Sequence, residues 1–206
     1  MGKYLGPVCR LCRRERVKLF LKGDKCSTAK CPLSKRKKAP GMGSSKKGKL
    51  SYYGMQLREK QKLKRFYYLS EAQFHKYYEL ATKARGNTGE VLLQILERRL
   101  DNIIYRAGFT TSRKQARQLV SHKFFTVNGI NVNIPSILIK KGDVIKIKEN
   151  RINSSIIQEN LNREISLPNW LEKIDAHTVK VIDLPLRSDI QDIQVKEQMI
   201  IELYSK

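Results

Sequence analysis

Residues 112–129, SRKQARQLVSHKFFTVNG, change their periodicity midway. The first half places Ala116, Leu119 and Val120 at helical spacing, whereas the second half is an apolar run that ends in Asn-Gly. Asn-Gly between apolar runs predicts a type I′ hairpin turn, because both residues tolerate positive φ. A later Lys-Gly-Asp turn opens a further strand over residues 144–148. The stretch therefore predicts a short helix followed by a small sheet.

This helix and sheet belong to a predicted α-then-β module that spans residues 90–149. Before the helix, apolar residues recur at three- and four-residue steps over residues 91–104. The spacing predicts one continuous helix that begins near Asn87 or Thr88 and turns this face to the core.

Two more helices are predicted ahead of the module. Residues 51–66 alternate apolar and basic side chains at helical spacing, and a second helix runs from Ser70 to about Ala84. Ser70 followed by Gln73 is typical of a capping box, and a second box of this kind begins at Ser112.

The remaining chain predicts an α+β protein. Residues 150–166 look helical and polar, and strands are expected around residues 179–182 and 199–204. The predicted boundaries are 1–50 for a basic extension that carries the cysteines, 51–89 with 150–206 for a helical domain with C-terminal strands, and 90–149 for the small α-then-β module.

Positive charge is concentrated at the start of the chain. Of the 42 Lys and Arg residues, 21 lie in residues 1–66 beside 3 acids, 14 lie in residues 67–149 beside 7, and 7 lie in residues 150–206 beside 9. The formal net charge of +23 is self-repulsive unless a polyanion neutralises it. Nucleic acid is the expected partner, bound on one side of the protein.

Membrane binding and catalysis find little support in the sequence. No apolar run approaches a membrane span, and the first residues lack a signal peptide's apolar core, so we expect a reducing cytosol or an equivalent organelle matrix. The histidines, His75, His122 and His177, stand in unrelated contexts without a P-loop or nucleophile motif. The chain is not expected to be an enzyme.

The four cysteines predict a metal site. Their spacing is two residues between Cys9 and Cys12, thirteen to Cys26 and four to Cys31, so one loop could bring four sulfurs around a tetrahedral zinc ion. A reducing compartment disfavours disulfides. Four thiolates leave no open position, so one structural zinc is expected; an iron–sulfur cluster and free thiols are the alternatives. Nearby basic residues are expected to lower the thiol pKa values; they are Arg10, Arg13, Arg14 and Lys30.

Arg113 and Arg117 lie four residues apart in the predicted short helix. They are predicted to face outward and contact successive phosphates, with the hairpin edge beside them. A solvated charged face is the alternative. The tyrosine pairs at 67–68 and 77–78 could stack on bases, although tyrosines that pack helices together are the more common case.

Several motifs closely resemble the small-subunit ribosomal protein four family. They are RLDNIIYR at 99–106, SRKQARQLVSH at 112–122, VNG at 127–129, YGMQLREKQK at 53–62 and KEQMIIELYSK at 196–206. GPVCRLCRRE at 6–15 looks like the zinc-bearing form of that family.

The resemblance implies a mainly helical domain with an N-terminal zinc site, in which residues 1–50 are a zinc-binding extension, and an inserted α-then-β RNA-binding module. It also implies a structural constituent of the small ribosomal subunit, in the cytoplasm or an organelle. Proteins like it bind a junction in the 5′ domain of small-subunit ribosomal RNA early in assembly. They contact small-subunit ribosomal protein five at an interface tied to decoding accuracy, line the channel through which messenger RNA enters, and in some cases repress their own translation. The resemblance implies no homo-oligomer and no membrane.

The residues expected to contact RNA lie along the basic segments and the matched motifs. They are Arg10, Arg13, Arg14, Lys18, Lys22, Lys35, Arg36, Lys37, Lys38, Gln56, Arg58, Lys62, Arg65, Arg113, Lys114, Gln115, Arg117, His122, Lys123 and Asn128.

Lys123 departs from the family pattern, which usually has Gly after the histidine that ends the short helix. A left-handed backbone there costs a non-Gly residue about 1 kcal/mol. Either the turn differs or a lysine–phosphate contact compensates.

Two rival functions remain. An RNA-modifying enzyme could share the module, but residues 150–206 are too few to hold its catalytic domain. A zinc regulator that binds DNA would need base-reading side chains on a helix next to the metal site, and no such helix is predicted.

Overall fold

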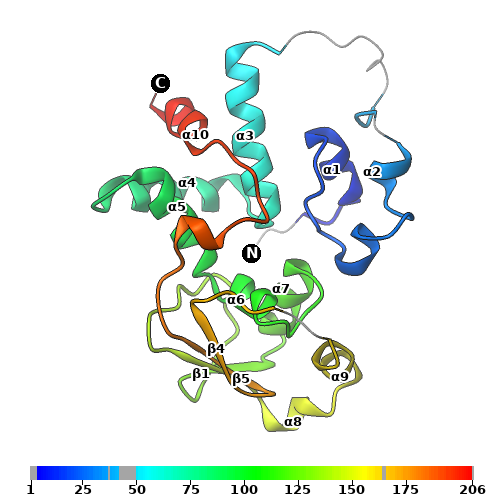
Figure 1. Cartoon of the computed structure of the whole chain (residues 1–206), viewed down its shortest axis with the longest axis vertical. Helices are drawn as coiled ribbons and strands as arrows, with labels where there is room; N and C mark the ends of the chain where they lie inside the picture. The colour runs from blue at the N-terminus through cyan, green and yellow to red at the C-terminus, as the bar shows by residue number, and fades with distance from the viewer. Residues whose placement is uncertain (1–3, 37, 42–49, 164–165, 206) are drawn as a thin grey trace. The chain divides into compact units, whose positions relative to one another are not determined.

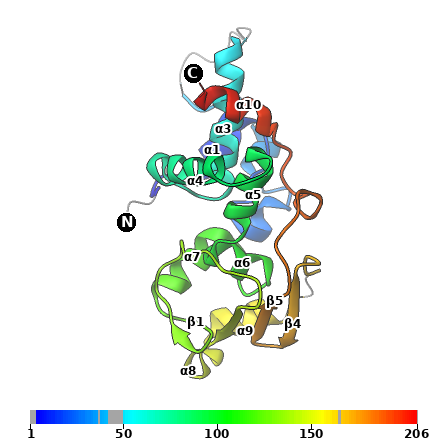
Figure 2. The same ribbon diagram turned by 90° about the vertical axis from the view of Figure 1, so that its left-hand side faces the viewer.

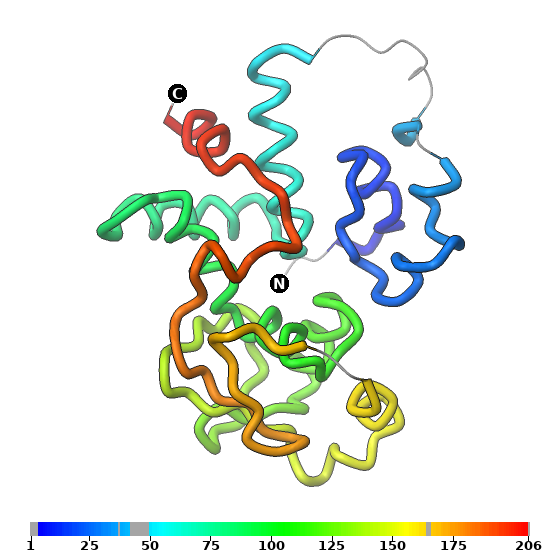
Figure 3. Tube along the Cα trace, viewed as in Figure 1, coloured from blue at the N-terminus to red at the C-terminus, as the bar shows by residue number. Residues whose placement is uncertain are grey.

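The computed structural model describes residues 4–36, 38–41, 50–163 and 166–205. Contacts divide the chain into two compact units. Residues 1–92 and 191–206 form what we call the helical unit, and residues 93–190 form the sheet unit. The Cα trace leaves the helical unit within one helix and returns to it only near the C-terminus (Figure 3).

The helical unit consists of short N-terminal helices followed by longer ones. They are α1 (Cys9–Glu15), the 3-10 helix η1 (Gly23–Cys26), α2 (Pro32–Lys35), α3 (Tyr52–Phe66), α4 (Glu71–Lys83), the start of α5 (Thr88–Glu97) and α10 (Glu197–Tyr204). The predicted capping residue Ser70 accepts a hydrogen bond from Gln73 N at 3.3 Å, and Ser51 accepts one from Gly54 N at 3.2 Å. The predicted helices over 51–66 and from Ser70 are confirmed.

The expected strand near residues 199–204 is wrong, because these residues form α10. Met199, Ile200 and Leu203 follow helical spacing, whereas the apolar run 199–201 alone also suits a strand, an ambiguity common in short apolar runs. Ile200 is fully buried, and α10 runs alongside α3 (Figures 1 and 2). Tertiary contact with α3 therefore selects the helix.

The sheet unit combines helices with one antiparallel sheet. Its elements are the rest of α5, α6 (Leu100–Arg106), α7 (Arg113–Ser121), β1 (Phe125–Val127), β2 (Ile130–Asn131), β3 (Val144–Ile147), α8 (Glu149–Ile152), α9 (Ser155–Leu161), β4 (Leu171–Asp175), β5 (Thr178–Val181) and the 3-10 helix η2 (Arg187–Asp189). The strand order is β2-β1-β3-β5-β4. Buried residues of α6, α7, α9 and the sheet share one core, including Ile104, Val120 and Phe125.

The predicted hairpin is confirmed. Asn128 and Gly129 have φ values of 49° and 79°, and Val127 pairs with Ile130 across the turn. The Asn128 side chain ties this turn to β3, because its amide donates to Asp143 Oδ1 and its oxygen accepts from Val144 N, both at 2.9 Å. The hairpin turn is therefore anchored to the neighbouring strand.

The predicted single helix over 91–104 is instead two helices, α5 and α6. Between them the backbone is extended at Arg99, which bridges Leu138. Leu100 N donates to Ile137 O at 2.9 Å, and Ile139 N donates to Arg98 O at 2.9 Å. These long-range backbone bonds replace helical ones, and periodicity alone gave no sign of them.

The contacts also group residues 150–190 with the module rather than with the helical domain. β5 pairs with β3, and β4 pairs with β5, so both late strands extend the sheet that begins with β1. The predicted helical character of 150–166 is confirmed up to Leu161 by α8 and α9, and residues 164–165 lie outside the described residues. In the described part of the chain, no helix is long and apolar enough to cross a membrane.

Candidate nucleic-acid interface

Exposed cations line the N-terminal segment of the helical unit. The predicted RNA-contacting residues that are exposed there are Arg10, Arg14, Lys18, Lys22, Lys35, Arg36 and Lys38. Arg13 is half-buried, and its Nε donates to the Lys38 carbonyl at 3.0 Å. Lys37 lies outside the described residues. With few acids nearby, these side chains give the segment a strongly positive surface.

The cysteines lie within this same segment. Cys9 and Cys12 lie three residues apart in α1, Cys26 ends η1, and Cys31 precedes α2. Three of the thiols are buried and Cys9 is half-buried. The Lys22 N–H donates to Cys26 Sγ at 3.4 Å. Burial, four sulfurs and a backbone N–H directed at one of them suit a structural thiolate site.

The described residues, which include all four cysteines, contain no group of three or more His, Cys, Asp or Glu side chains gathered as metal ligands. Cysteine thiolates are suitable zinc ligands. To bind one zinc ion, however, the four sulfurs would have to come closer together.

The expectation that nearby cations lower the thiol pKa values is wrong for Cys12 and Cys26. Burial raises the pKa of Cys12 to about 11, and a backbone hydrogen bond from Leu19 offsets this only in part. Burial also raises the pKa of Cys26, although the Lys22 hydrogen bond opposes the shift. Desolvation of the thiolate outweighs the charges on the surrounding surface.

A buried carboxylate connects the cysteine-bearing segment to α3. The Glu15 side chain is 1% exposed and pairs with Arg58 at 2.9 Å and with Arg65. Burial raises the Glu15 pKa, and the two guanidinium groups oppose this shift. Arg58 and Arg65 were predicted RNA contacts, but they face Glu15 and are only partly exposed.

Two further α3 residues are also engaged within the protein. Gln56 is fully buried, and its Nε2 donates to Glu202 Oε2 at 3.0 Å. This placement differs from the predicted RNA contact, because the amide holds α10 instead. Lys62 pairs with Glu59 at 2.6 Å and donates to the Gln194 carbonyl at 3.1 Å.

In the sheet unit, the expectation that Arg113 and Arg117 face outward is wrong. Both are buried, with 5% and 9% of their surface exposed. Positions 113, 116, 117 and 120 follow the i, i+3, i+4, i+7 pattern of one helix face, so the two arginines share the core-facing side with Ala116 and Val120.

Neighbouring polar side chains hold the Arg113 guanidinium. Its Nε donates to Asn102 Oδ1 at 2.7 Å, and its Cζ lies 4.4 Å from the Tyr105 ring centroid. Asn102 in turn donates to Glu97 Oε2 at 2.6 Å, and Arg106 makes two hydrogen bonds to the Glu97 carboxylate. A buried charge needs partners of this kind.

Asp101 holds the other arginines of this network. It accepts from Arg99 Nε at 3.0 Å and from Arg99 Nη2 at 2.6 Å, and Arg117 Nη1 lies 3.8 Å away. The Arg99 side chain is fully buried. The motif arginines of this region thus build the inside of the sheet unit.

Exposed polar residues lie near both ends of α7 and in the hairpin turn that follows. Lys114, His122, Lys123 and Asn128 are exposed. Gln115 is half-buried, and its Oε1 accepts hydrogen bonds from the Thr111 N–H at 2.8 Å and from the Thr111 hydroxyl at 2.9 Å. The Ser112 hydroxyl accepts a hydrogen bond from Gln115 N at 3.3 Å, as the predicted cap requires.

The tyrosine pairs mainly pack helices. Tyr67, Tyr68 and Tyr77 are buried, and Tyr78 stacks on Tyr204 with ring centroids 4.4 Å apart. The packing interpretation is therefore confirmed over base stacking for these side chains.

Comparison with known proteins identifies the family. The family described as "Ribosomal protein S4/S9 N-terminal domain" matches residues 3–97, and the "S4 domain" family matches residues 98–145. The chain is 55% identical to "Small ribosomal subunit protein uS4" of Thermoanaerobacter sp. (strain X514), over all of both chains. The chain belongs to the uS4 family. The uS4 proteins of Caldicellulosiruptor saccharolyticus and Thermodesulfovibrio yellowstonii are 55% and 52% identical, again over all of both chains.

Membership of the uS4 family confirms the predicted resemblance and the prediction that the chain is not an enzyme, because this is a family of ribosomal proteins. An RNA-modifying enzyme is thereby set aside.

One positioning residue of this uS4-family chain escaped the sequence analysis. Glu15 is the first acid of the chain and is surrounded by basic residues. A lone acid in such a segment is itself a signal, because it predicts a specific ion pair. The partners, Arg58 and Arg65, are more than forty positions away, so only the fold reveals them.

Proposed function

We propose that this chain is a structural component of the small ribosomal subunit that binds the subunit's RNA directly. The observation that carries the proposal is the similarity over its whole length to proteins named small ribosomal subunit protein uS4. The charge distribution supports it, since 21 of the 42 Lys and Arg residues lie in residues 1–66 beside 3 acids. Cations that neutralise phosphates provide affinity without reading bases.

The exposed residues form the proposed RNA contacts. In the sheet unit they are Lys114, His122 and Lys123, and in the helical unit they are Arg10, Arg14, Lys18, Lys22, Lys35, Arg36 and Lys38. The buried residues Gln56, Arg113 and Arg117 support this surface from within. Arg58 and Arg65 hold the cysteine-bearing segment against α3, because both pair with Glu15.

The proposed place in the ribosome follows from the family resemblance. The chain binds the junction of the 5′ domain of small-subunit ribosomal RNA early in assembly. It contacts small-subunit ribosomal protein five, contributes to decoding accuracy and lines the channel through which messenger RNA enters. It works as a single copy per subunit in the cytoplasm, and repression of its own translation is part of the proposal.

The proposed cofactor is one structural zinc ion on Cys9, Cys12, Cys26 and Cys31. Four sulfurs within one short basic segment support it, and so does the backbone N–H directed at Cys26 Sγ. Zinc would favour the thiolates and fix the loops between α1 and α2. Their exposed arginines and lysines would then have a defined arrangement.

The RNA proposal is tested by binding the full chain to a transcript of the 5′ domain at increasing salt. The logarithm of the affinity should fall linearly with the logarithm of salt, by about 0.7 to 0.9 for each phosphate contacted. Changing Arg10, Arg14 and Lys18 to Gln should flatten this slope. A matched variant with Gln at the exposed residues Lys76, Lys83 and Arg85 should change it much less. An affinity that does not vary with salt would contradict the proposal.

The zinc proposal is tested by metal analysis of protein purified without chelator. About one zinc per chain is expected, and Cys12→Ser or Cys26→Ser should remove it. Recovery of iron, or of no metal from a chain that binds the RNA, would overturn the assignment.

A further inference from the structure

Three cationic residues are connected to Phe124, just after α7. Lys123 precedes Phe124 in sequence, and Lys148 N donates to the Phe124 carbonyl at 3.0 Å. The Arg151 Cζ lies 5.0 Å from the Phe124 ring centroid, a cation–π distance. Arg151 N also donates to the Lys148 carbonyl at 2.9 Å. Phe124 thus brings α7, β3 and α8 to one point; we call Lys123, Lys148 and Arg151 the Phe124 cluster.

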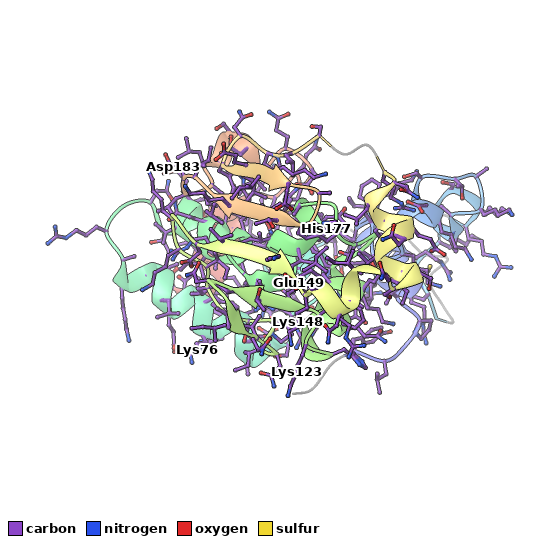
Figure 4. The ribbon with its side chains drawn as sticks, turned by 90° about the horizontal axis from the view of Figure 1, so that it is seen from below. Lys76, Lys123, Lys148, Glu149, His177 and Asp183 are labelled. Carbon is purple, nitrogen blue, oxygen red and sulfur yellow. The ribbon has the colours of Figure 1, made fainter. Side chains whose placement is uncertain are left out.

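The three charges of the Phe124 cluster have no acidic partner among the residues that the structure describes. Lys123 and Arg151 are exposed, and Lys148 is half-buried. The acid nearest in sequence, Glu149, is paired with Lys146 at 3.1 Å. Figure 4 looks onto the face where Lys123 and Lys148 are labelled. Surface cations without an acidic partner remain available to an anionic ligand.

The backbone at Lys123 is strained. Its φ is 59°, the left-handed region that favours glycine. The turn is fixed in this form, because Lys123 N donates to Val120 O at 2.9 Å and Phe124 N donates to Leu119 O at 3.1 Å. The turn that usually holds glycine is therefore present here, with lysine in it. A strained residue at an exposed position points to a role outside the folding of the chain.

We propose that the Phe124 cluster is a binding site for backbone phosphates of folded RNA. This inference rests on the proposed function and extends it. Lys148 and Arg151 lie beyond the matched S4 domain, which ends at residue 145, so β3 and α8 would widen the RNA-binding surface. Lys123 follows α7, Lys148 stands between β3 and α8, and Arg151 lies in α8. Exposed or half-buried cations on these segments suit successive phosphates of a polyanion better than one small anion.

The test compares salt dependence on the 5′-domain transcript. In the full chain, Lys123→Gln, Lys148→Gln and Arg151→Gln together should lower the slope by about 2 to 3, at about 0.7 to 0.9 for each phosphate no longer neutralised. The matched control removes the same charge elsewhere, with Gln at Lys76, Lys83 and Arg85, and should keep most of the slope. An unchanged slope in the triple variant, or an equal decrease in both variants, would contradict the proposed RNA-binding role of the Phe124 cluster.

Lys123 allows a second, independent test. Lys123→Gly should raise the melting temperature by about 2 to 4 °C, because glycine accepts the left-handed backbone. The same variant should still lower the slope by about 0.7 to 0.9, whereas Lys123→Arg should keep it. Stabilisation without any decrease in RNA binding would show that the lysine contacts no phosphate and would overturn its place in the cluster.

Failure of this inference can be told from failure of the proposed function. If the unaltered chain shows a steep salt dependence and the triple variant keeps it, only the cluster is wrong. If the unaltered chain shows none, the proposed function itself fails. A triple variant with an unchanged melting temperature excludes misfolding as the cause of weaker binding. Binding of polyglutamate instead of RNA would assign the cluster to an acidic protein partner and overturn the proposal.

Discussion

At the scale of single residues, Asp101 links two arginines inside the sheet unit. It accepts two hydrogen bonds from the fully buried Arg99, and it lies 3.8 Å from Arg117. A buried guanidinium is tolerated only with such a partner, because desolvation of an unpaired charge costs several kcal/mol. The network therefore constrains how α6 and α7 fit together.

We predict that Asp101→Asn lowers the free energy of unfolding by about 3 to 5 kcal/mol, because it removes the carboxylate that pairs with the buried Arg99 guanidinium. Urea denaturation of the full chain measures the change. The matched control is Asp183→Asn, since Asp183 pairs with Lys141 at 3.2 Å on an exposed surface and should leave the midpoint in place. Equal midpoints for Asp101→Asn and the unaltered chain would contradict the role given to the network.

The same residues mark a limit of sequence analysis. The spacing of Arg113 with Ala116 and Val120 already places the arginine on the core-facing side of α7. Burial of the Arg113 guanidinium is stabilised by Asn102, whose Oδ1 accepts a hydrogen bond from Arg113 Nε at 2.7 Å. That partner belongs to another helix, so the charge of the arginine favoured exposure even though its spacing placed it on the core-facing side.

At the scale of elements, local chemistry predicted boundaries well where a side chain acts on its own backbone. Ser70 and Ser112 cap their helices as expected, and Asn128 adopts positive φ in the hairpin. The predictions failed where distant segments decide the outcome. Residues 98–101 leave the helix to pair with residues 135–139, and α10 forms because it packs on α3.

Glu71 joins three helices of the helical unit. Its carboxylate accepts from Lys60 Nζ at 2.7 Å and Lys64 Nζ at 2.8 Å, both on α3, and from the Tyr204 hydroxyl of α10 at 3.1 Å. Burial alone would raise the pKa of Glu71, but the two lysine hydrogen bonds outweigh it and lower the pKa to about 2.

A depressed carboxyl pKa means that the folded state favours the ionised form. The resulting stability is present above the ordinary pKa of 4.5 and is lost as pH falls from about 4.5 to about 2. We predict that Glu71→Gln makes the melting temperature less dependent on pH in this window. Glu79→Gln is the control, because Glu79 is exposed and pairs with the exposed His75 at 3.3 Å. A pH dependence unchanged by Glu71→Gln would contradict this account.

At the scale of the whole molecule, net charge determines the class of partner, and the fold determines which cations reach it. Residues 1–66 carry 21 of the 42 Lys and Arg residues beside only 3 acids, whereas the sheet unit buries several of its arginines and exposes cations near the ends of α7 and β3. Composition alone predicted the class of partner, because net charge does not depend on the fold. Which cations face that partner depends on buried acids such as Glu15 and Asp101, and only the structure locates those.

The most direct test of the central claim is sedimentation of ribosomal particles from cells that make this chain, after a high-salt wash. The account predicts that the chain remains with the small subunit in amounts equal to that subunit's other proteins. Finding nearly all of the chain in a free pool without RNA would contradict it.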